Sequence, residues 1–340
     1  MVAQMRPDLC RKLLRPLSLV SVAFACACGG SATSPNLPPD AATSADAANL
    51  TADAAAALSD AVSPMDAVAD VALAPDVAAP IDAAVGPLRE TRTIEVGEVR
   101  VDVVLSRPAV TEVDALIVFH GTTGRNNRAL PAAERTLDEF GALLDRQDVL
   151  LVSVVYLEEG RLMGDAVLDG EAALLWVRSE APRALGVTIR RVFLGGHSQG
   201  GYLVTRLNTM HTVDGVVANA PGPLDLVYRC GLEEAGEVES SATCGLFHRQ
   251  FGPTTEDPEA YASRSLLRFT RGHRADLLVV QGMADDSIQM RSWPLFKADL
   301  EACEDCQGRE FVELPGLGHP ALFTSAEARA AFNAFLDRPR

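Results

Sequence analysis

The sequence of 340 residues contains little lysine and few aromatic residues. Lys12 and Lys297 are its only lysines, and Phe, Trp and Tyr together make up 5% of the chain. The formal net charge is -16. Proteins that bind phosphate backbones need clustered Lys and Arg, so this charge argues against nucleic acid as a partner. The composition also excludes a collagen-like repeat and a polytopic membrane protein.

Motifs for common cofactors are missing as well. The chain has no G-x-x-x-x-G-K-[ST] phosphate loop and no dinucleotide-binding fingerprint. Cys303 and Cys306 form a C-x-x-C pair, but no second Cys or His pair has the spacing that a zinc site needs. We therefore expect no cofactor and no metal.

Charge and composition divide the chain into three segments. Residues 1–28 have a net charge of +3, residues 29–88 have eight Asp and no Lys, Arg or Glu, and residues 89–340 have a net charge of -11. About a third of residues 29–88 are Ala, and few of their side chains are large and apolar. Such a segment cannot offset the entropy of ordering, so we predict a disordered tether.

Residues 1–28 are typical of an export signal. Basic residues precede an apolar stretch over about 17–27, which is too short to span a bilayer. The stretch ends in a sequence that resembles a bacterial lipobox, with Cys28 as the expected lipidated residue and Cys26 as the alternative. Each has Ala instead of Leu three residues upstream, and 25–27 also fits ordinary A-x-A cleavage. We expect export with a lipid anchor at the bacterial cell envelope, or secretion; a buried helix of the domain is the remaining interpretation.

Residues 89–340 show the pattern of an α/β domain. Two alternating segments around Gly97 predict an antiparallel hairpin, and continuous apolar runs predict strands buried on both faces. Amphipathic segments between these runs predict helices on both faces of a mostly parallel sheet. Residues 222–274 interrupt the alternation of predicted strands and helices, and we expect them to form an insertion over the sheet's edge. The hairpin covers 91–96 and 99–105; the buried strands cover 115–119, 149–155, 192–194, 213–218, 277–280 and 311–314; the helices cover 132–146, 170–180, 199–208, about 292–301, and 326–336.

A G-x-S-x-G pentapeptide, residues 196–200, follows the apolar run at 192–194 and opens the helix at 199–208. A nucleophile on such a tight strand-to-helix turn has strained backbone angles, and bulky neighbours would collide there. This context makes Ser198 the candidate nucleophile.

With this motif the chain resembles the α/β-hydrolase family over about residues 91–338. The resemblance implies that backbone N–H groups of Thr122, in the segment H-G-T-T-G, and of Gln199 form an oxyanion hole. It implies Asp285, in Q-G-M-A-D-D after the run at 277–280, as the catalytic acid. Asp286 is the first alternative, with helix capping as its other role, and Asp225 the second.

His319 lies beyond the acid and follows the last predicted strand, as the family's catalytic histidine does. The resemblance implies that Ser198 attacks, His319 transfers the proton, and Asp285 orients the imidazole. The five other histidines include His197, which is next to the nucleophile but inside the turn.

Four cysteines of the predicted exported domain are expected to form disulfides. Proximity in the sequence favours Cys230 with Cys244 and Cys303 with Cys306.

Residues 170–176 before the strand of the pentapeptide, Gly200-Gly201-Tyr202 after its serine, and 282–286 followed by 316–319 resemble the prolyl-oligopeptidase and dienelactone-hydrolase-like branch. Secreted esterases share the general plan. Prolyl oligopeptidases carry a propeller domain before the catalytic one, whereas only the predicted tether precedes it here. We therefore expect a serine hydrolase of carboxylic esters, with a small or polymer-linked ester as substrate and a membrane contact only through the lipid anchor. The alternatives are a serine peptidase and a catalytically silent binding module; the sequence does not indicate an oligomeric state.

Overall fold

An eight-stranded sheet runs through residues 88–339, the part of the chain that the computed structural model describes. The predicted export signal, with Cys26 and Cys28, lies outside these residues, and so does the predicted tether except for Leu88. No helix among residues 88–339 is long and apolar enough to cross a membrane.

The sheet is mostly parallel, as the sequence predicts. Across the sheet the strands follow the order β1-β2-β4-β3-β5-β6-β7-β8. β1 with β2, and β2 with β4, are antiparallel, and all other neighbours are parallel. The strands are β1 (Leu88–Val96), β2 (Val99–Arg107), β3 (Glu112–Phe119), β4 (Val149–Val155), β5 (Thr188–His197), β6 (Gly215–Asn219), β7 (Leu277–Gly282) and β8 (Arg309–Leu314).

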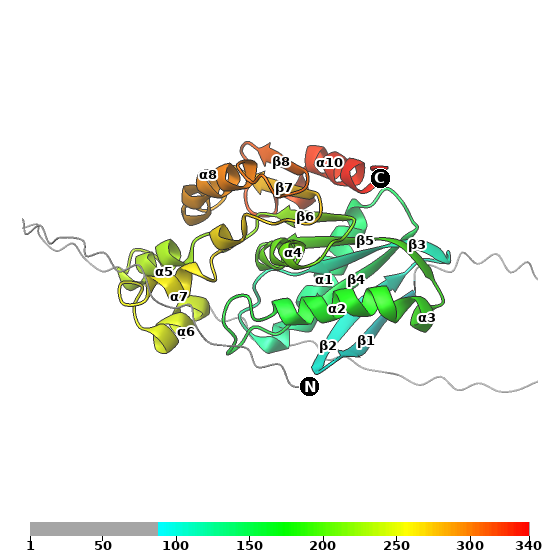
Figure 1. Cartoon of the computed structure of the whole chain (residues 1–340), viewed down its shortest axis with the longest axis horizontal. Coiled ribbons are helices and arrows are strands. Elements are labelled where there is room, and N and C mark those ends of the chain that lie inside the picture. Colours follow the sequence, from blue (N-terminus) through cyan, green and yellow to red (C-terminus); the bar gives the residue numbers. More distant parts are fainter. Residues whose placement is uncertain (1–87, 340) are drawn as a thin grey trace, which may run out of the picture. The chain divides into compact units, whose positions relative to one another are not determined.

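Helices cover both faces of the sheet, and each face has its own hydrophobic core (Figure 1). One core contains the apolar sides of α1 (Ala129–Leu143), α9 (Ala321–Thr324) and α10 (Ala326–Leu336). The other contains those of α2 (Val167–Ser179), α4 (Gln199–Met210) and α8 (Ser287–Glu301). Central strands such as β4 are buried along their whole length, because helices cover them on both sides. The short helices η1 (Asn126–Arg128) and α3 (Ala181–Leu185) lie in connections.

The insertion predicted at 222–274 connects β6 to β7. It folds as α5 (Leu226–Glu234), α6 (Ala242–Phe251), α7 (Pro258–Ala262) and η2 (Leu266–Phe269). Because β6 is an interior strand, the insertion does not follow an outer strand of the sheet; it lies beyond the carboxyl ends of the strands (Figure 1).

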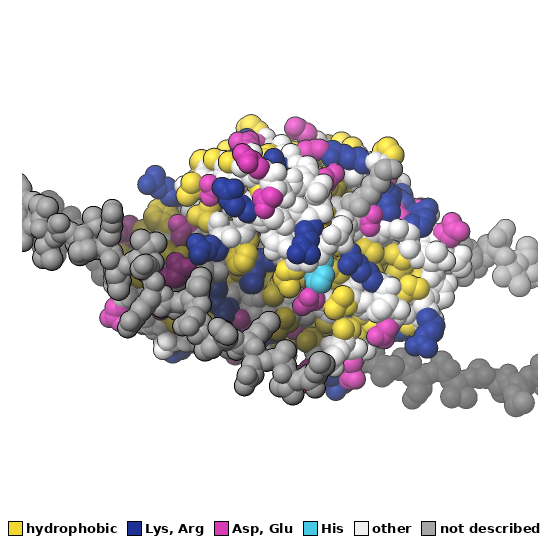
Figure 2. Space-filling view, viewed as in Figure 1, with side chains coloured by type: hydrophobic (Ala, Val, Ile, Leu, Met, Phe, Trp, Pro, Cys, Tyr) yellow, Lys and Arg dark blue, Asp and Glu magenta, His cyan; other side chains and the backbone are white. Residues whose placement is uncertain are grey.

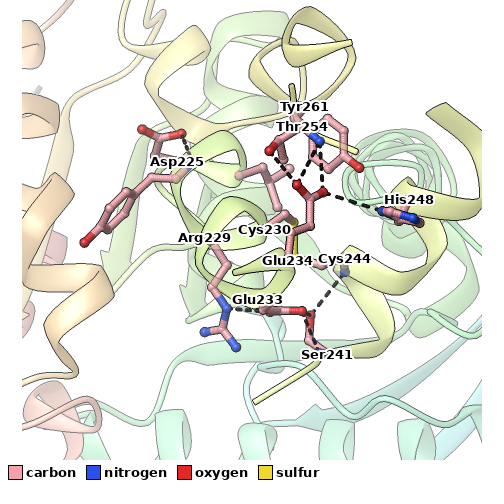
Figure 3. Close-up of a disulfide and its surroundings, with 12 residues drawn as sticks. Asp225, Arg229, Cys230, Glu233, Glu234, Ser241, Cys244, His248, Thr254 and Tyr261 are labelled. Atoms are coloured by element: carbon pink, nitrogen blue, oxygen red, sulfur yellow. Dashed lines mark hydrogen bonds and ion pairs between the residues drawn. A yellow bond between two sulfur atoms is a disulfide. The ribbon is translucent and has the colours of Figure 1, made fainter. Parts of the chain in front are cut away.

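Two carboxylates and one disulfide hold the insertion together (Figure 3). Cys230 of α5 is bonded to Cys244 of α6. Glu233 accepts hydrogen bonds from the backbone N–H and the hydroxyl of Ser241. Glu234 accepts the backbone N–H and the hydroxyl of Thr254. The end of α5 is therefore tied to both loops that follow it.

Three helices differ from the prediction by three or more residues at one or both ends: α8, α1, and α2, which spans 167–179 and not 170–180. α8 begins at Ser287 and not near 292, because the Asp286 carboxylate caps the N–H groups of Ile288 and Gln289. α1 spans 129–143 and not 132–146.

Acidic and basic side chains are interspersed on the face that carries α2 and α4 (Figure 2). A different cluster lies where β3 begins. The Asp114 side chain is 1% exposed and lies 2.7 Å from Arg146 and 2.6 Å from Arg191, measured between carboxylate oxygen and guanidinium nitrogen. Arg190 contributes a third contact at 3.2 Å. These arginines come from the β4 and β5 sides of the sheet, so one buried carboxylate joins three neighbouring strands.

We expect Asp114→Asn to lower the free energy of unfolding by roughly 1–3 kcal/mol, because the arginines lose charge-assisted bonds but remain partly exposed to water. Asp138→Asn is the matched control, since Asp138 is 63% exposed and pairs with Arg89 on the surface. It should change stability by less than about 0.5 kcal/mol. Urea unfolding measures both; equal effects would contradict the structural role of Asp114.

Candidate functional site

Ser198 occupies a strained turn between β5 and α4. Its φ of 56° and ψ of -117° are unusual for any residue other than glycine. A Cβ on Gly196 would lie 2.1 Å from the carbonyl oxygen of Gly200, and a Cβ on Gly200 would lie 2.1 Å from that of Phe119. The glycines of the pentapeptide are thus required by backbone contacts, and the turn holds Ser198 at the carboxyl edge of the sheet.

Asp285 and His319 meet beside this turn. Asp285 follows β7 and His319 follows β8, which are parallel neighbours. The Nδ1 atom of His319 lies 2.8 Å from the Oδ2 atom of Asp285. The Asp285 side chain is 3% exposed and that of His319 is 38% exposed. The imidazole can therefore reach a solute while its carboxylate partner is covered.

The pKa of Asp285 is lowered although burial raises it. The hydrogen bond and charge of His319, the N–H of Asp286 and the amide of Gln281 together outweigh the burial. Asp285 therefore stays ionised, as a partner for an imidazolium must.

The two alternatives to Asp285 have other partners. Asp286 caps α8, and Asp225 caps α5 by accepting the N–H of Tyr228. Neither forms an ion pair or hydrogen bond with His319 among residues 88–339. Of the three aspartates, Asp285 is thus the one that contacts His319 among the described residues.

Gln281 was missed by sequence reasoning. It is fully buried at the end of β7, and its amide donates to Asp285 Oδ2 at 3.0 Å. Its carbonyl accepts from Gln289 at 3.2 Å, and Gln289 also donates to the backbone of Pro221 at 2.9 Å. This chain of amides fixes the carboxylate relative to the loop after β6.

Thr122 and Gln199 are joined by a side-chain hydrogen bond beside the nucleophile. The Thr122 hydroxyl donates to the Gln199 side-chain carbonyl at 2.8 Å. A Cβ on Gly121 would lie 3.3 Å from the Cβ of Ser198, so this loop packs directly against the nucleophile. Gln199 is the first residue of α4, where N–H groups have no acceptor within the helix. Both predicted backbone donors therefore belong to segments that adjoin Ser198.

Glu158 holds the loop that carries Thr122, and no motif in the sequence points to it. Its carboxylate accepts the N–H groups of Thr123 and Gly124 at 3.0 and 3.1 Å. Burial raises the pKa of Glu158, and these bonds oppose the rise. The hydroxyl of Tyr156 also donates to the carbonyl oxygen of His120 at the start of the loop.

Three cavities meet at this site. The first, about 250 Å³, lies between Ser198, His319 and the insertion. The second, about 320 Å³, lies between Thr122, residues 157–163 and α6. The third, about 500 Å³, lies between Ser198, His319 and α1. Ser198 and His319 line two of them, and no hydrogen bond joins the two side chains within residues 88–339.

Cys303 is bonded to Cys306, so both disulfides have the pairing that the sequence favours. Asp305 lies beside this pair, and the three side chains are close enough together for their ligand atoms to surround one metal ion. Cysteines bonded to each other cannot supply the thiolates that such a site needs.

Known proteins resemble the chain in fold but not in sequence. No protein-family model matches the chain, and no curated protein matches its sequence. An esterase from Pyrobaculum calidifontis has a similar structure, with a TM-score of 0.54 and 20% identity over 74% of this chain and 84% of that chain. A variant of the esterase rPPE has a TM-score of 0.54 and 16% identity over 74% and 82%.

An acylaminoacyl peptidase from Pyrococcus horikoshii has a TM-score of 0.53 and 13% identity. The similarity covers 74% of this chain but 42% of the peptidase. At these identities the likeness concerns the fold. The chain has the α/β-hydrolase fold, which confirms the predicted fold class.

Two histidines near the site, the buried His120 and the partly buried His197, should make stability depend on pH. Burial lowers the pKa of His120 and of His197 to about 4. The unfolded chain, with an ordinary histidine pKa near 6.5, binds protons first as pH falls. The free energy of unfolding should therefore decrease from about pH 6.5 to about pH 4, by up to about 1.4 kcal/mol per unit for each histidine.

His197→Asn removes one of the two groups and should make this slope shallower. Urea unfolding at half-unit pH steps measures the slope in both proteins. Parallel curves for the wild type and the variant would show that His197 titrates normally.

Proposed function

We propose that the chain is a serine hydrolase that cleaves carboxylic esters through an acyl-enzyme intermediate. The observation that carries the proposal is the hydrogen bond between Asp285 and His319 at a cavity that Ser198 also lines. A buried carboxylate, an accessible imidazole and a strained serine are the parts that nucleophilic acyl transfer needs.

In the first half of the reaction, the Ser198 oxygen attacks the ester carbonyl and its proton passes to Nε2 of His319. Asp285 stabilises the resulting imidazolium through Nδ1. His319 then returns the proton to the departing alcohol, which leaves the acyl group on Ser198. The contact between serine and histidine is often long in free enzymes and shortens when substrate binds.

In the second half, water loses a proton to His319 and attacks the acyl group, and the carboxylic acid leaves. In both halves the carbonyl oxygen becomes negative. The N–H groups of Thr122 and Gln199 are the proposed donors to it. The hydrogen bonds of Glu158 to the loop of Thr122 hold the Thr122 N–H in place before the charge develops. Donors fixed in advance in this way provide most of the transition-state stabilisation at such sites.

We propose an ester as the substrate in place of an amide, because the alcohol of an ester is a better leaving group than the amine of an amide. The two solved esterases of similar fold support this choice, and the solved acylaminoacyl peptidase keeps amides among the compounds to be assayed.

We also propose that the domain works outside the cytoplasm. The two disulfides of the described domain support this location, because such bonds persist in oxidising compartments. The predicted signal at 1–28, with lipidation at Cys28 or Cys26, would attach the protein to the cell envelope through residues 29–88.

Ser198→Ala should abolish labelling by a fluorophosphonate and lower kcat for short 4-nitrophenyl esters by about 10⁴-fold or more. Ser179→Ala is the control, because Ser179 is an exposed serine at the end of α2. Labelling is followed by intact mass, with prolyl and acylamino amides assayed in parallel. A wild-type protein that neither reacts with the reagent nor cleaves any substrate would indicate a binding module.

Gln281→Leu should lower kcat about tenfold with little change in KM, because Asp285 loses a bond that aligns it with His319. Gln307→Leu is the control, since Gln307 is exposed and close to the amino end of β8. Steady-state kinetics on one 4-nitrophenyl ester gives both constants. A rise in KM alone would mean that Gln281 shapes the cavity and does not position the acid.

A further inference from the structure

The second cavity has a chemical character that the proposed reaction does not require. It begins at Thr122 and Gln199, the proposed oxyanion residues, and extends between residues 157–163 and α6 of the insertion. A substrate with its carbonyl at Ser198 would therefore place one of its two substituents toward this cavity.

Part of the wall is apolar. Leu157, Leu162, Met163 and Leu246 line the cavity. Leu157 is 42% exposed, so part of this apolar wall is open to solvent. An aliphatic or aromatic portion of a substrate would cover this surface.

Three arginines line the second cavity, and one of them has a side-chain partner among residues 88–339. Arg125 follows the loop of Thr122, and Arg249 comes from α6 on the insertion. Neither guanidinium forms an ion pair or hydrogen bond within residues 88–339, and both side chains are exposed. The third arginine of the wall, Arg161, is paired with Asp169 at 2.6 Å.

The carboxylates of the wall are already engaged. Glu158 accepts the N–H groups of Thr123 and Gly124, and Glu159 accepts the N–H of Asn126 at 3.4 Å. Both acids are thus held by backbone donors of the loop. The guanidinium groups of Arg125 and Arg249, which come from two separate segments, are therefore available to a ligand.

The first cavity provides a contrast. Its arginine, Arg229, is paired with Glu233 at 2.7 Å. Its acids, Asp225 and Asp286, are both helix caps. No unpaired cation lines this cavity among the described residues, so it suits a neutral portion of the substrate.

We propose that the second cavity binds a carboxylate on the ester substrate, with Arg125 and Arg249 as its ligands and the leucines around the connecting carbons. This inference rests on the proposed esterase function and specifies its substrate class. Guanidinium groups match carboxylates in geometry and bind them with charge-assisted hydrogen bonds. The substrates are then esters that carry a second, free acid group.

Two pairs of substrates test this proposal. 4-Nitrophenyl hydrogen adipate and 4-nitrophenyl hexanoate differ by a carboxylate at the end of the acyl chain. 4-Butyryloxybenzoate and the butyrate ester of 4-hydroxybenzamide differ by a carboxylate on the alcohol side. The measured quantity is the ratio of kcat/KM for the anionic ester to that for its neutral match.

In the variant Arg125→Gln with Arg249→Gln, we expect this ratio to fall about tenfold or more for one pair, mainly through KM. The pair that responds identifies which substituent enters the cavity. In the wild type, salt should lower the same ratio, because exposed charges are screened.

The matched control is Arg183→Gln with Arg271→Gln. It removes the same charge from exposed arginines that do not line the three cavities, so its ratios should equal those of the wild type. If both ratios are unchanged in the cavity variant, the carboxylate-binding proposal is overturned. Rapid cleavage of the neutral esters in that experiment would still support the esterase function. Failure to cleave any ester would overturn both.

Discussion

The strained backbone at Ser198 is the constraint on which the rest of the site depends. A positive φ at a serine persists only where the surroundings force it, and here the turn is enclosed by backbone on both sides. Gly196 and Gly200 allow β5 and α4 to approach within distances that no Cβ would permit. The turn raises the hydroxyl above the sheet and places the first N–H groups of α4 beside it. A single local geometry thus provides the proposed nucleophile and one of its oxyanion donors.

Parallel strands provide the remaining groups. β3, β5, β7 and β8 end at the same edge of the sheet, so the loops after them bring Thr122, Ser198, Asp285 and His319 together. The buried polar groups beneath them keep this arrangement. Gln281 fixes Asp285, and Glu158 fixes the loop of Thr122. The insertion then contributes walls to two of the three cavities at the site, and its segments are held together by Glu233, Glu234 and the bond between Cys230 and Cys244.

The sheet and the residues that meet at the candidate site could be predicted because both leave local signals. Buried strands form continuous apolar runs, and glycines accompany the turn at Ser198 and the loops after β3, β7 and β8. The predicted start of α8 is too late because it follows the apolar pattern, although helix capping is the other role expected for Asp286, which caps α8 in the structure. The roles of Gln281 and Glu158 could not be predicted, because their hydrogen bonds are set by the tertiary fold and are not indicated by a sequence motif. The insertion could not be derived because its helices are short and are joined by side-chain bonds to loops. For the same reason, the unpaired state of Arg125 and Arg249 within residues 88–339 becomes visible only when the cavity walls are assembled.

The central claim is that Ser198 forms a covalent acyl intermediate. Rapid mixing of the protein with excess 4-nitrophenyl butyrate, followed by acid quenching, measures this directly. We expect a burst of 4-nitrophenol close to one equivalent per active protein, if deacylation is the slower step, and a butyryl adduct on the peptide that contains Ser198. An adduct on a different residue, or steady hydrolysis with Ser198 never acylated at any quench time, would contradict the claim.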